Sequence, residues 1–134
     1  MRTDRFTVDT SGRVVTELTD RVRAFAREGG SDGLLNVFVP HATAGLALIE
    51  TGAGSEADLE EVLGRILPRD DRYAHRHGST GHGADHLLPA FVSSSVVLPV
   101  HGGEVDLGTW QRVVLVDTNR ENDRRTVILT LLEG

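Results

Sequence analysis

Residues 110–133, WQRVVLVDTNRENDRRTVILTLLE, hold two apolar runs separated by the turn-forming segment 119–123. Runs rich in valine, isoleucine and threonine and bounded by asparagine and aspartate are typical of paired strands. Upstream, SSVVLPV (94–100) and GEVDLG (103–108) flank a turn at 101–103. The last third of the chain is therefore predicted to form four consecutive strands.

Within two of these strands, the stretches 113–116 and 127–134 are apolar on both alternating faces, which is typical of strands buried on both sides. A subunit interface, or a sheet that curves on itself around a filled interior, would each provide the second face.

The first two thirds of the chain mix helices and strands. We expect strands at 5–8, 34–40 and 45–50, a helix at 17–27 that Thr16 caps and Gly29-Gly30 ends, a helix from Ser55 to Pro68, and a short helix from about Ala84. This order predicts one α+β domain over residues 1–134, with a mixed or largely antiparallel sheet, two main helices and one short helix.

Composition excludes several classes of chemistry. The chain has no cysteine, and all 14 basic residues are arginine, so disulfides, thiolate catalysis and Schiff bases are excluded. A net charge of -6 argues against a nucleic-acid partner. No apolar run approaches the roughly 18 residues of a membrane span, and the start has no apolar leader, so we expect a cytoplasmic protein without membrane contact.

Four of the six histidines lie within 73–89, YAHRHGSTGHGADHLLP. His82 and His86 have the i,i+4 spacing of one helix face, but Gly83 stands where a zinc protease has its glutamate. His75 and His77, two residues apart, are expected to point in different directions. Each histidine taken alone is either a solvated loop residue or a metal ligand.

Two polar residues, one before the predicted strand at 45–50 and one at its end, are candidate site residues. His41 follows a buried strand and precedes small residues, which let a ligand approach closely. Glu50 ends the second strand and is a candidate general base or a partner that orients an imidazole. Asp58 offers the same chemistry, although its position near a helix start favours a capping charge.

Several motifs together resemble the YjbQ-like family, whose members are described as secondary thiamine-phosphate synthases. They are PHATAGLALIE, YAH, ADHLLPAFVSSSVVLPVHGGEVDLGTWQRV and RRTVILTLLEG, which span about 37–134. The resemblance implies a homotrimer with a histidine-lined pocket near subunit contacts. It also implies that a pyrimidine methyl pyrophosphate is joined to a thiazole phosphate, which releases pyrophosphate.

The family motifs match individual residues of this chain. The resemblance implies His41, His75 and His86 as ligands of a divalent metal, zinc first among the candidates, and leaves His77 and His82 as loop residues. It implies His41 and Glu50 as catalytic residues, and Gln111, Ser94 and Ser95 as contacts for a phosphorylated metabolite.

Two departures from the family pattern support an alternative function. Ile49 and Leu88 stand where the family usually has asparagine and lysine, so the chain has fewer polar groups for a substrate. The alternative is a non-catalytic trimer that binds a phosphorylated metabolite or a metal. A third hypothesis, a scaffold protein, predicts no ligand response at all.

Overall fold

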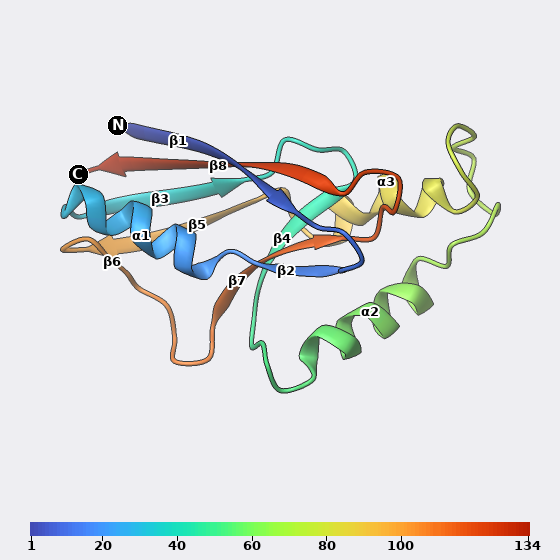
Figure 1. The fold of residues 1–134 in the computed structure, drawn as a ribbon, viewed down its shortest axis with the longest axis horizontal. Coiled ribbons are helices and arrows are strands. Elements are labelled where there is room, and N and C mark those ends of the chain that lie inside the picture. The colour runs from blue at the N-terminus through green and yellow to red at the C-terminus, as the bar shows by residue number, and fades with distance from the viewer.

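The computed structural model describes all 134 residues and contains eight strands and three helices (Figure 1). The strands are β1 (Arg2–Asp9), β2 (Val15–Glu17), β3 (Gly33–Phe38), β4 (Ala44–Ile49), β5 (Ser95–His101), β6 (Glu104–Val105), β7 (Arg112–Asp117) and β8 (Arg124–Glu133). The helices are α1 (Thr19–Gly29), α2 (Ser55–Ile66) and α3 (His82–Phe91). The predicted α+β class, with two main helices and a short third one, is confirmed.

The strands form two antiparallel sheets rather than one. The first has the order β1-β8-β3-β5-β6, and the second has the order β2-β7-β4. The second sheet includes β2, which contains Thr16, the predicted helix cap, and Glu17, the predicted first residue of the helix; the residue before α1 is Leu18 instead. Because Val15–Glu17 pairs with Val114–Val116 of β7, α1 begins at Thr19 rather than Glu17.

Two apolar clusters fill the interior. The larger lies between α1, the inner face of the five-stranded sheet and one face of the three-stranded sheet, and contains Val22, Phe25, Leu35, Leu115 and Leu129 among others. The smaller joins α2 and α3 to the other face of the three-stranded sheet through Leu63, Leu88, Val114 and Val116. Consecutive β7 residues therefore enter different clusters, which confirms that 113–116 is buried on both faces.

The outer face of the five-stranded sheet differs from the prediction. In β8 only alternate residues are buried, and Leu132 is 58% exposed. Leu34 of β3 pairs with Leu132, and Leu34, Phe38 and Val97 are also exposed. Within one chain the prediction that β8 is buried on both faces is wrong, because α1 covers only the opposite face.

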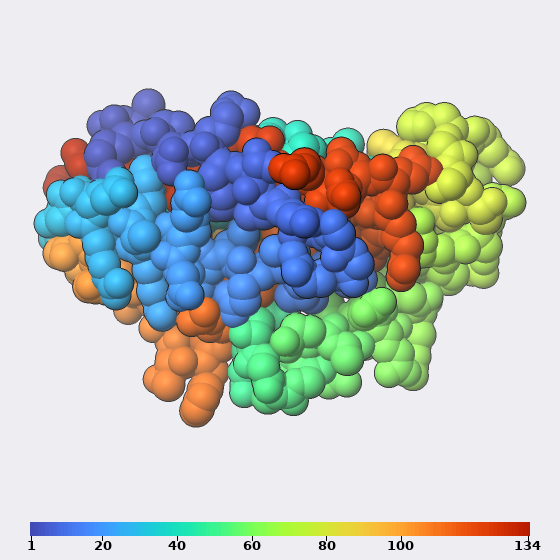
Figure 2. All heavy atoms as spheres, in the orientation of Figure 1, coloured from blue at the N-terminus to red at the C-terminus, as the bar shows by residue number.

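The segment between α2 and α3 projects from one end of the molecule (Figure 2). It is followed by α3, which begins at His82, two residues earlier than predicted. No helix of the protein has the length and apolar character that crossing a bilayer requires.

Candidate metal centre

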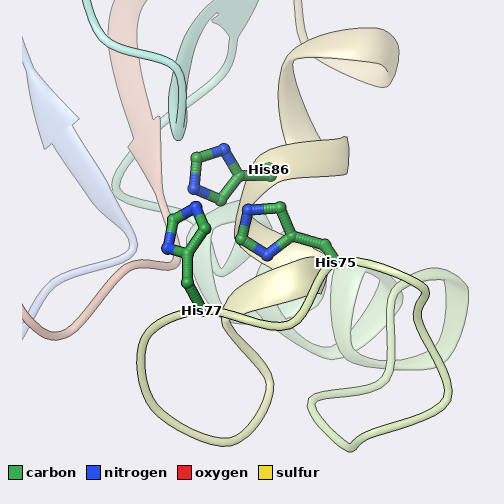
Figure 3. A group of neighbouring side chains, drawn as sticks. All are labelled: His75, His77 and His86. Carbon is green, nitrogen blue, oxygen red and sulfur yellow. The ribbon is translucent and has the colours of Figure 1, made fainter.

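Three imidazoles converge beside the start of α3. One ring nitrogen from each of His75, His77 and His86 lies within 4.8 Å of the other two (Figure 3). His75 and His77 come from the projecting segment, and His86 comes from the second turn of α3. The predicted ligands His75 and His86 are thus brought together, with ring centroids 4.2 Å apart.

The prediction that His75 and His77 point apart is wrong, since their ring centroids are only 3.9 Å apart. The alternation rule applies to a regular strand, whereas residues 71–81 follow an irregular path. His82 is also not a loop residue: it opens α3 and is buried, and its Nε2 lies 3.0 Å from Nε2 of His86. All four histidines of the quoted segment therefore form one group, here called the histidine cluster.

Close packing holds the projecting segment against α3. The Tyr73 hydroxyl donates to the Pro68 carbonyl at 2.6 Å, and the Tyr73 side chain lies against Gly83, where an added Cβ atom would lie 2.7 Å from Cβ of Tyr73. Gly78 has φ +81°, and a Cβ atom there would lie 2.7 Å from the His82 ring. The glycines thus allow the segment to turn back and to deliver His75 and His77 to the cluster.

The surroundings of His75 and His86 favour their neutral forms. Burial is the main cause that lowers the pKa of His75, and the neighbouring His77 and His82 lower it further. Burial also lowers the pKa of His86, reinforced by the other three histidines and opposed by Asp85. A neutral imidazole has a free lone pair, which is the form that binds a metal ion.

A buried carboxylate lies behind the cluster. Asp85 is fully buried, forms an ion pair with Arg69 and accepts a hydrogen bond from the Thr118 hydroxyl at 2.8 Å, both through Oδ1. Its Oδ2 has no hydrogen-bond partner and lies 3.6 Å from Nδ1 of His82. A carboxylate behind an imidazole is the usual arrangement that orients a histidine ligand.

The donor set fits a transition-metal ion. Two nitrogens bound tetrahedrally at about 2.0–2.1 Å from zinc lie roughly 3.4 Å apart, so the observed limit of 4.8 Å requires small side-chain movements. Nδ1 of His75 is buried without a hydrogen-bond partner. A polar cavity of about 120 Å³ adjoins His75, His77 and His82.

His41 lies outside the cluster. Its Nε2 accepts a hydrogen bond from the backbone N–H of Thr126 in β8, at 2.9 Å. Burial lowers its pKa, the nearby Arg125 guanidinium lowers it further, and Asp117 opposes the shift. Because Nε2 is an acceptor, a neutral His41 carries its proton on Nδ1. Within one chain His41 does not join the other predicted ligands. Its role as a metal ligand stays a prediction.

The other predicted residues lie in two further places. Glu50 is exposed at the end of β4 that is remote from His41, and a six-residue strand spans roughly 17–20 Å. Gln111 is at the same end, next to Arg112, and its Oε1 accepts from the Gly108 amide at 2.8 Å. One chain therefore does not combine Glu50 and His41 in a single pocket.

Ser94 and Ser95 lie at the start of β5. The Ser94 carbonyl accepts a hydrogen bond from the Val39 amide, two residues before His41, and the exposed Ser95 pairs with Phe38. The predicted substrate contacts Ser94 and Gln111 thus precede strands of different sheets, and their joint role stays a prediction.

The largest cleft contains none of the predicted site residues. It has a volume of about 320 Å³ and is lined by the β1–β2 and β7–β8 turns, including Arg13, Asn119 and Asp123. Its lining mixes acidic and basic side chains and has no buried unpartnered polar atom. The smaller cavity at the histidine cluster has the more specific chemistry.

The sequence analysis missed His77 and His82 as members of the cluster. For His82 a signal was present, since its i,i+4 spacing from His86 correctly predicted a shared helix face. For His77 the only signals were the local density of histidines and the glycine that follows.

Fold and site together define a small α+β protein of paired antiparallel sheets with a histidine cluster at one end. Residues 4–134 match the family model described as UPF0047 protein YjbQ-like, and the chain belongs to this family. It is 63% identical to the UPF0047 protein Rv2556c of Mycobacterium tuberculosis over 134 residues, which is all of both chains.

More distant relatives share the fold. A UPF0047 protein of Archaeoglobus fulgidus is 32% identical over 126 residues, covering 93% of this chain and 98% of its own. The crystal structure of a hypothetical protein from Aeropyrum pernix K1 superposes with a TM-score of 0.89 at 33% identity and covers 100% of both chains. The predicted family is confirmed over nearly the whole sequence.

Proposed function

We propose that this protein binds a divalent transition-metal ion, zinc first among the candidates, through His75, His77 and His86. The observation that carries the proposal is the convergence of three ring nitrogens within 4.8 Å. The lowered pKa values of His75 and His86 support it, because neutral imidazoles have lone pairs available. Three protein ligands leave a position open for a substrate oxygen.

The substrate class that we propose is a phosphorylated metabolite. Arg76 lies between His75 and His77 in sequence and lines the same cavity, where it offers a cation to an anionic group. A volume of about 120 Å³ is well below the roughly 300–1,000 Å³ of a typical ligand pocket. The cavity therefore suits a phosphate-sized end of the substrate, with the remainder lying outside it.

The reaction that the family resemblance suggests is of the thiamine-phosphate-synthase type. The thiazole nitrogen would form a bond to the pyrimidine methylene carbon while the bond from that carbon to the pyrophosphate oxygen breaks. A bound cation would supply charge stabilisation to the departing pyrophosphate. In this proposal the imidazoles would hold the cation that binds the anionic substrate. Arg76 would contact phosphate oxygens directly.

A homotrimer is part of the proposal. The exposed apolar side chains Leu34, Phe38, Val97 and Leu132 on one sheet face support self-association, because contiguous apolar patches usually mark interfaces. In a trimer, Glu50, Gln111 and the two serines of one copy could contribute to a site on a neighbouring copy.

A non-catalytic metal- or metabolite-binding protein is the second candidate. It is favoured by the distance between the histidine cluster and the predicted catalytic residue Glu50, which is exposed at the far end of β4. Ile49 and Leu88 add no polar group for a substrate.

Elemental analysis of the purified protein tests metal binding. We expect about one metal ion per chain, lost in His75→Ala, His77→Ala and His86→Ala and retained in His101→Ala, whose histidine is exposed at the end of β5. Metal-free wild-type protein that also takes up none on titration would refute the proposal. Pyrophosphate release with and without metal then separates the two candidates, because ligand-dependent melting without turnover favours the non-catalytic one.

A further inference from the structure

Two buried polar atoms face each other without forming a hydrogen bond. Nδ1 of His82 and Oδ2 of Asp85 both lack partners, and they lie 3.6 Å apart. The His82 side chain is 8% exposed and that of Asp85 is 0% exposed. Unsatisfied buried polar groups are rare because each has lost its hydrogen bonds to water, so this pair calls for a functional explanation.

The surroundings of Asp85 determine which of its oxygens is free. Oδ1 is occupied by the Arg69 guanidinium and the Thr118 hydroxyl, and Arg69 also donates to the Thr118 carbonyl at 3.0 Å. Arg69 and Thr118 therefore hold the Asp85 carboxylate through the oxygen that faces away from His82. Its free Oδ2 is an acceptor directed towards the imidazole.

The other ring nitrogen of His82 faces the cluster. Its Nε2 lies 3.0 Å from Nε2 of His86, while the His82 ring centroid lies 5.6 Å from that of His75 and 5.3 Å from that of His77. Two nitrogens at 3.0 Å must share a proton or, as ligands, lie beside one cation. A separation near 3.4 Å is expected between two ligands of a tetrahedral zinc ion, so the observed distance suits neighbouring ligands.

We propose that Asp85 is a positioning residue that makes His82 the fourth imidazole ligand of the cluster. By accepting the Nδ1 proton of His82, Asp85 selects the tautomer in which Nε2 presents a lone pair to the ion. This inference deepens the proposed function and depends on it. It implies a site with four protein nitrogens, in which a substrate oxygen enters by displacing one imidazole or by adding a fifth ligand.

Glu121 is the other candidate partner of His82. Its Oε2 is 3.9 Å from Nδ1, but the side chain is 42% exposed and its Oε1 accepts from the Ser79 amide. Asp85 is closer, fully buried and held by two donors. Closing the 3.6 Å gap to a hydrogen bond of about 2.8–3.0 Å takes a small ring movement of His82.

The decisive variant is Asp85→Asn. Arg69 and Thr118 both donate to the Oδ1 position, so the asparagine oxygen would occupy that position and its NH₂ group would face His82. An NH₂ donor requires Nδ1 of His82 to be an acceptor, which transfers the proton to Nε2 and blocks the lone pair. We expect the affinity for Zn²⁺ to fall about 10- to 100-fold, the usual effect of changing such a partner.

Three readouts are measured on the full chain: Zn²⁺ affinity by chelator competition, the visible spectrum of the Co²⁺-loaded protein, and the tautomer of His82 by ¹⁵N NMR without metal. We expect Nδ1–H in the wild type and Nε2–H in Asp85→Asn, with weaker Co²⁺ absorption in the variant. Glu121→Gln is the matched control and should leave all three unchanged. Arg69→Met removes the ion pair of Asp85 but leaves its free oxygen facing His82. It therefore measures how far general destabilisation of this region alone changes the three readouts.

The outcomes separate the inference from the proposed function. If wild-type protein binds no metal, the proposed function fails. If it binds metal but Asp85→Asn matches it in affinity, spectrum and tautomer, the inference alone is refuted. Should Asp85→Asn not fold, His82→Gln replaces it: an unchanged Co²⁺ spectrum there refutes a fourth imidazole ligand, and a weakened spectrum with lower affinity supports it.

Discussion

His41 accepts a hydrogen bond from the backbone of Thr126, with 2.9 Å between Nε2 and the amide nitrogen. The contact joins the β3–β4 connection to β8, 85 residues later in the chain. A histidine that resembles a metal ligand by motif therefore has a structural role within a single chain.

The first prediction concerns this contact. His41→Ala removes the acceptor for the Thr126 amide, and we expect a loss of about 1–2 kcal/mol in the free energy of unfolding. Urea unfolding measures the loss, and elemental analysis of the same sample should show unchanged metal content. Loss of the metal with full stability would instead favour His41 as a ligand, contributed to a neighbouring copy.

The second prediction concerns the turn that places His82. Gly78→Ala introduces a Cβ atom 2.7 Å from the His82 ring at φ +81°, whereas Gly12→Ala at φ +67° meets no atom within 4 Å. Both variants should lose about 1 kcal/mol of stability from backbone strain. Only Gly78→Ala should also weaken Zn²⁺ binding, as measured by chelator competition. Equal metal affinity in the two variants would show that the turn does not shape the cluster.

The third prediction concerns a buried ion pair. The side chains of Arg125 and Asp117 are 3% and 1% exposed, and Nε of Arg125 lies 2.5 Å from Oδ2 of Asp117. Arg125 also donates to the Thr43 hydroxyl, and Asp117 accepts from the Asn119 amide. Arg125→Met leaves the Asp117 carboxylate buried without its cation, which costs roughly 3–5 kcal/mol. Replacing both residues with apolar ones should recover much of this loss. Urea unfolding of the single and double variants provides the comparison.

The fourth prediction concerns pH. Burial raises the pKa of Glu17, but hydrogen bonds from Arg112, Thr51 and Thr19 outweigh it, so the folded-state pKa lies below the ordinary value of 4.5. The resulting stabilisation is present above the unfolded-state pKa and is lost as the pH falls through the folded-state value. Because the side chain is 40% exposed, we expect less than about 1 kcal/mol. Unfolding free energies of wild type and Glu17→Gln should converge as the pH falls through the folded-state pKa.

The fifth prediction concerns the outer sheet face. Val97→Glu places a charge among Leu34, Phe38 and Leu132, and we expect it to dissociate the proposed trimer to single chains. Sedimentation should then show a threefold lower mass. Val62→Glu, at an exposed position on α2, is the control and should sediment like the wild type. A wild-type protein that is already a single chain would refute the trimer.

Much of the fold was predictable from local patterns. The limits of β8, β3, β4 and α2 lie within about two residues of the predicted ones, because turn residues and a change of hydrophobic period mark them. The division into two sheets was not predictable. Antiparallel strands give the same alternation whichever sheet they join, and β2 is only three residues long.

The sequence by itself determined the class of fold, the family and the exclusion of thiol and lysine chemistry, and its family motifs predicted that His75 and His86 belong to one site. Only the tertiary structure decided that His77 and His82 join them and that His41 contacts β8 instead. The physical reason is that side-chain directions follow from spacing only where backbone dihedrals are regular. In an irregular segment they depend on packing, here on Tyr73, Gly78 and the buried face of α3.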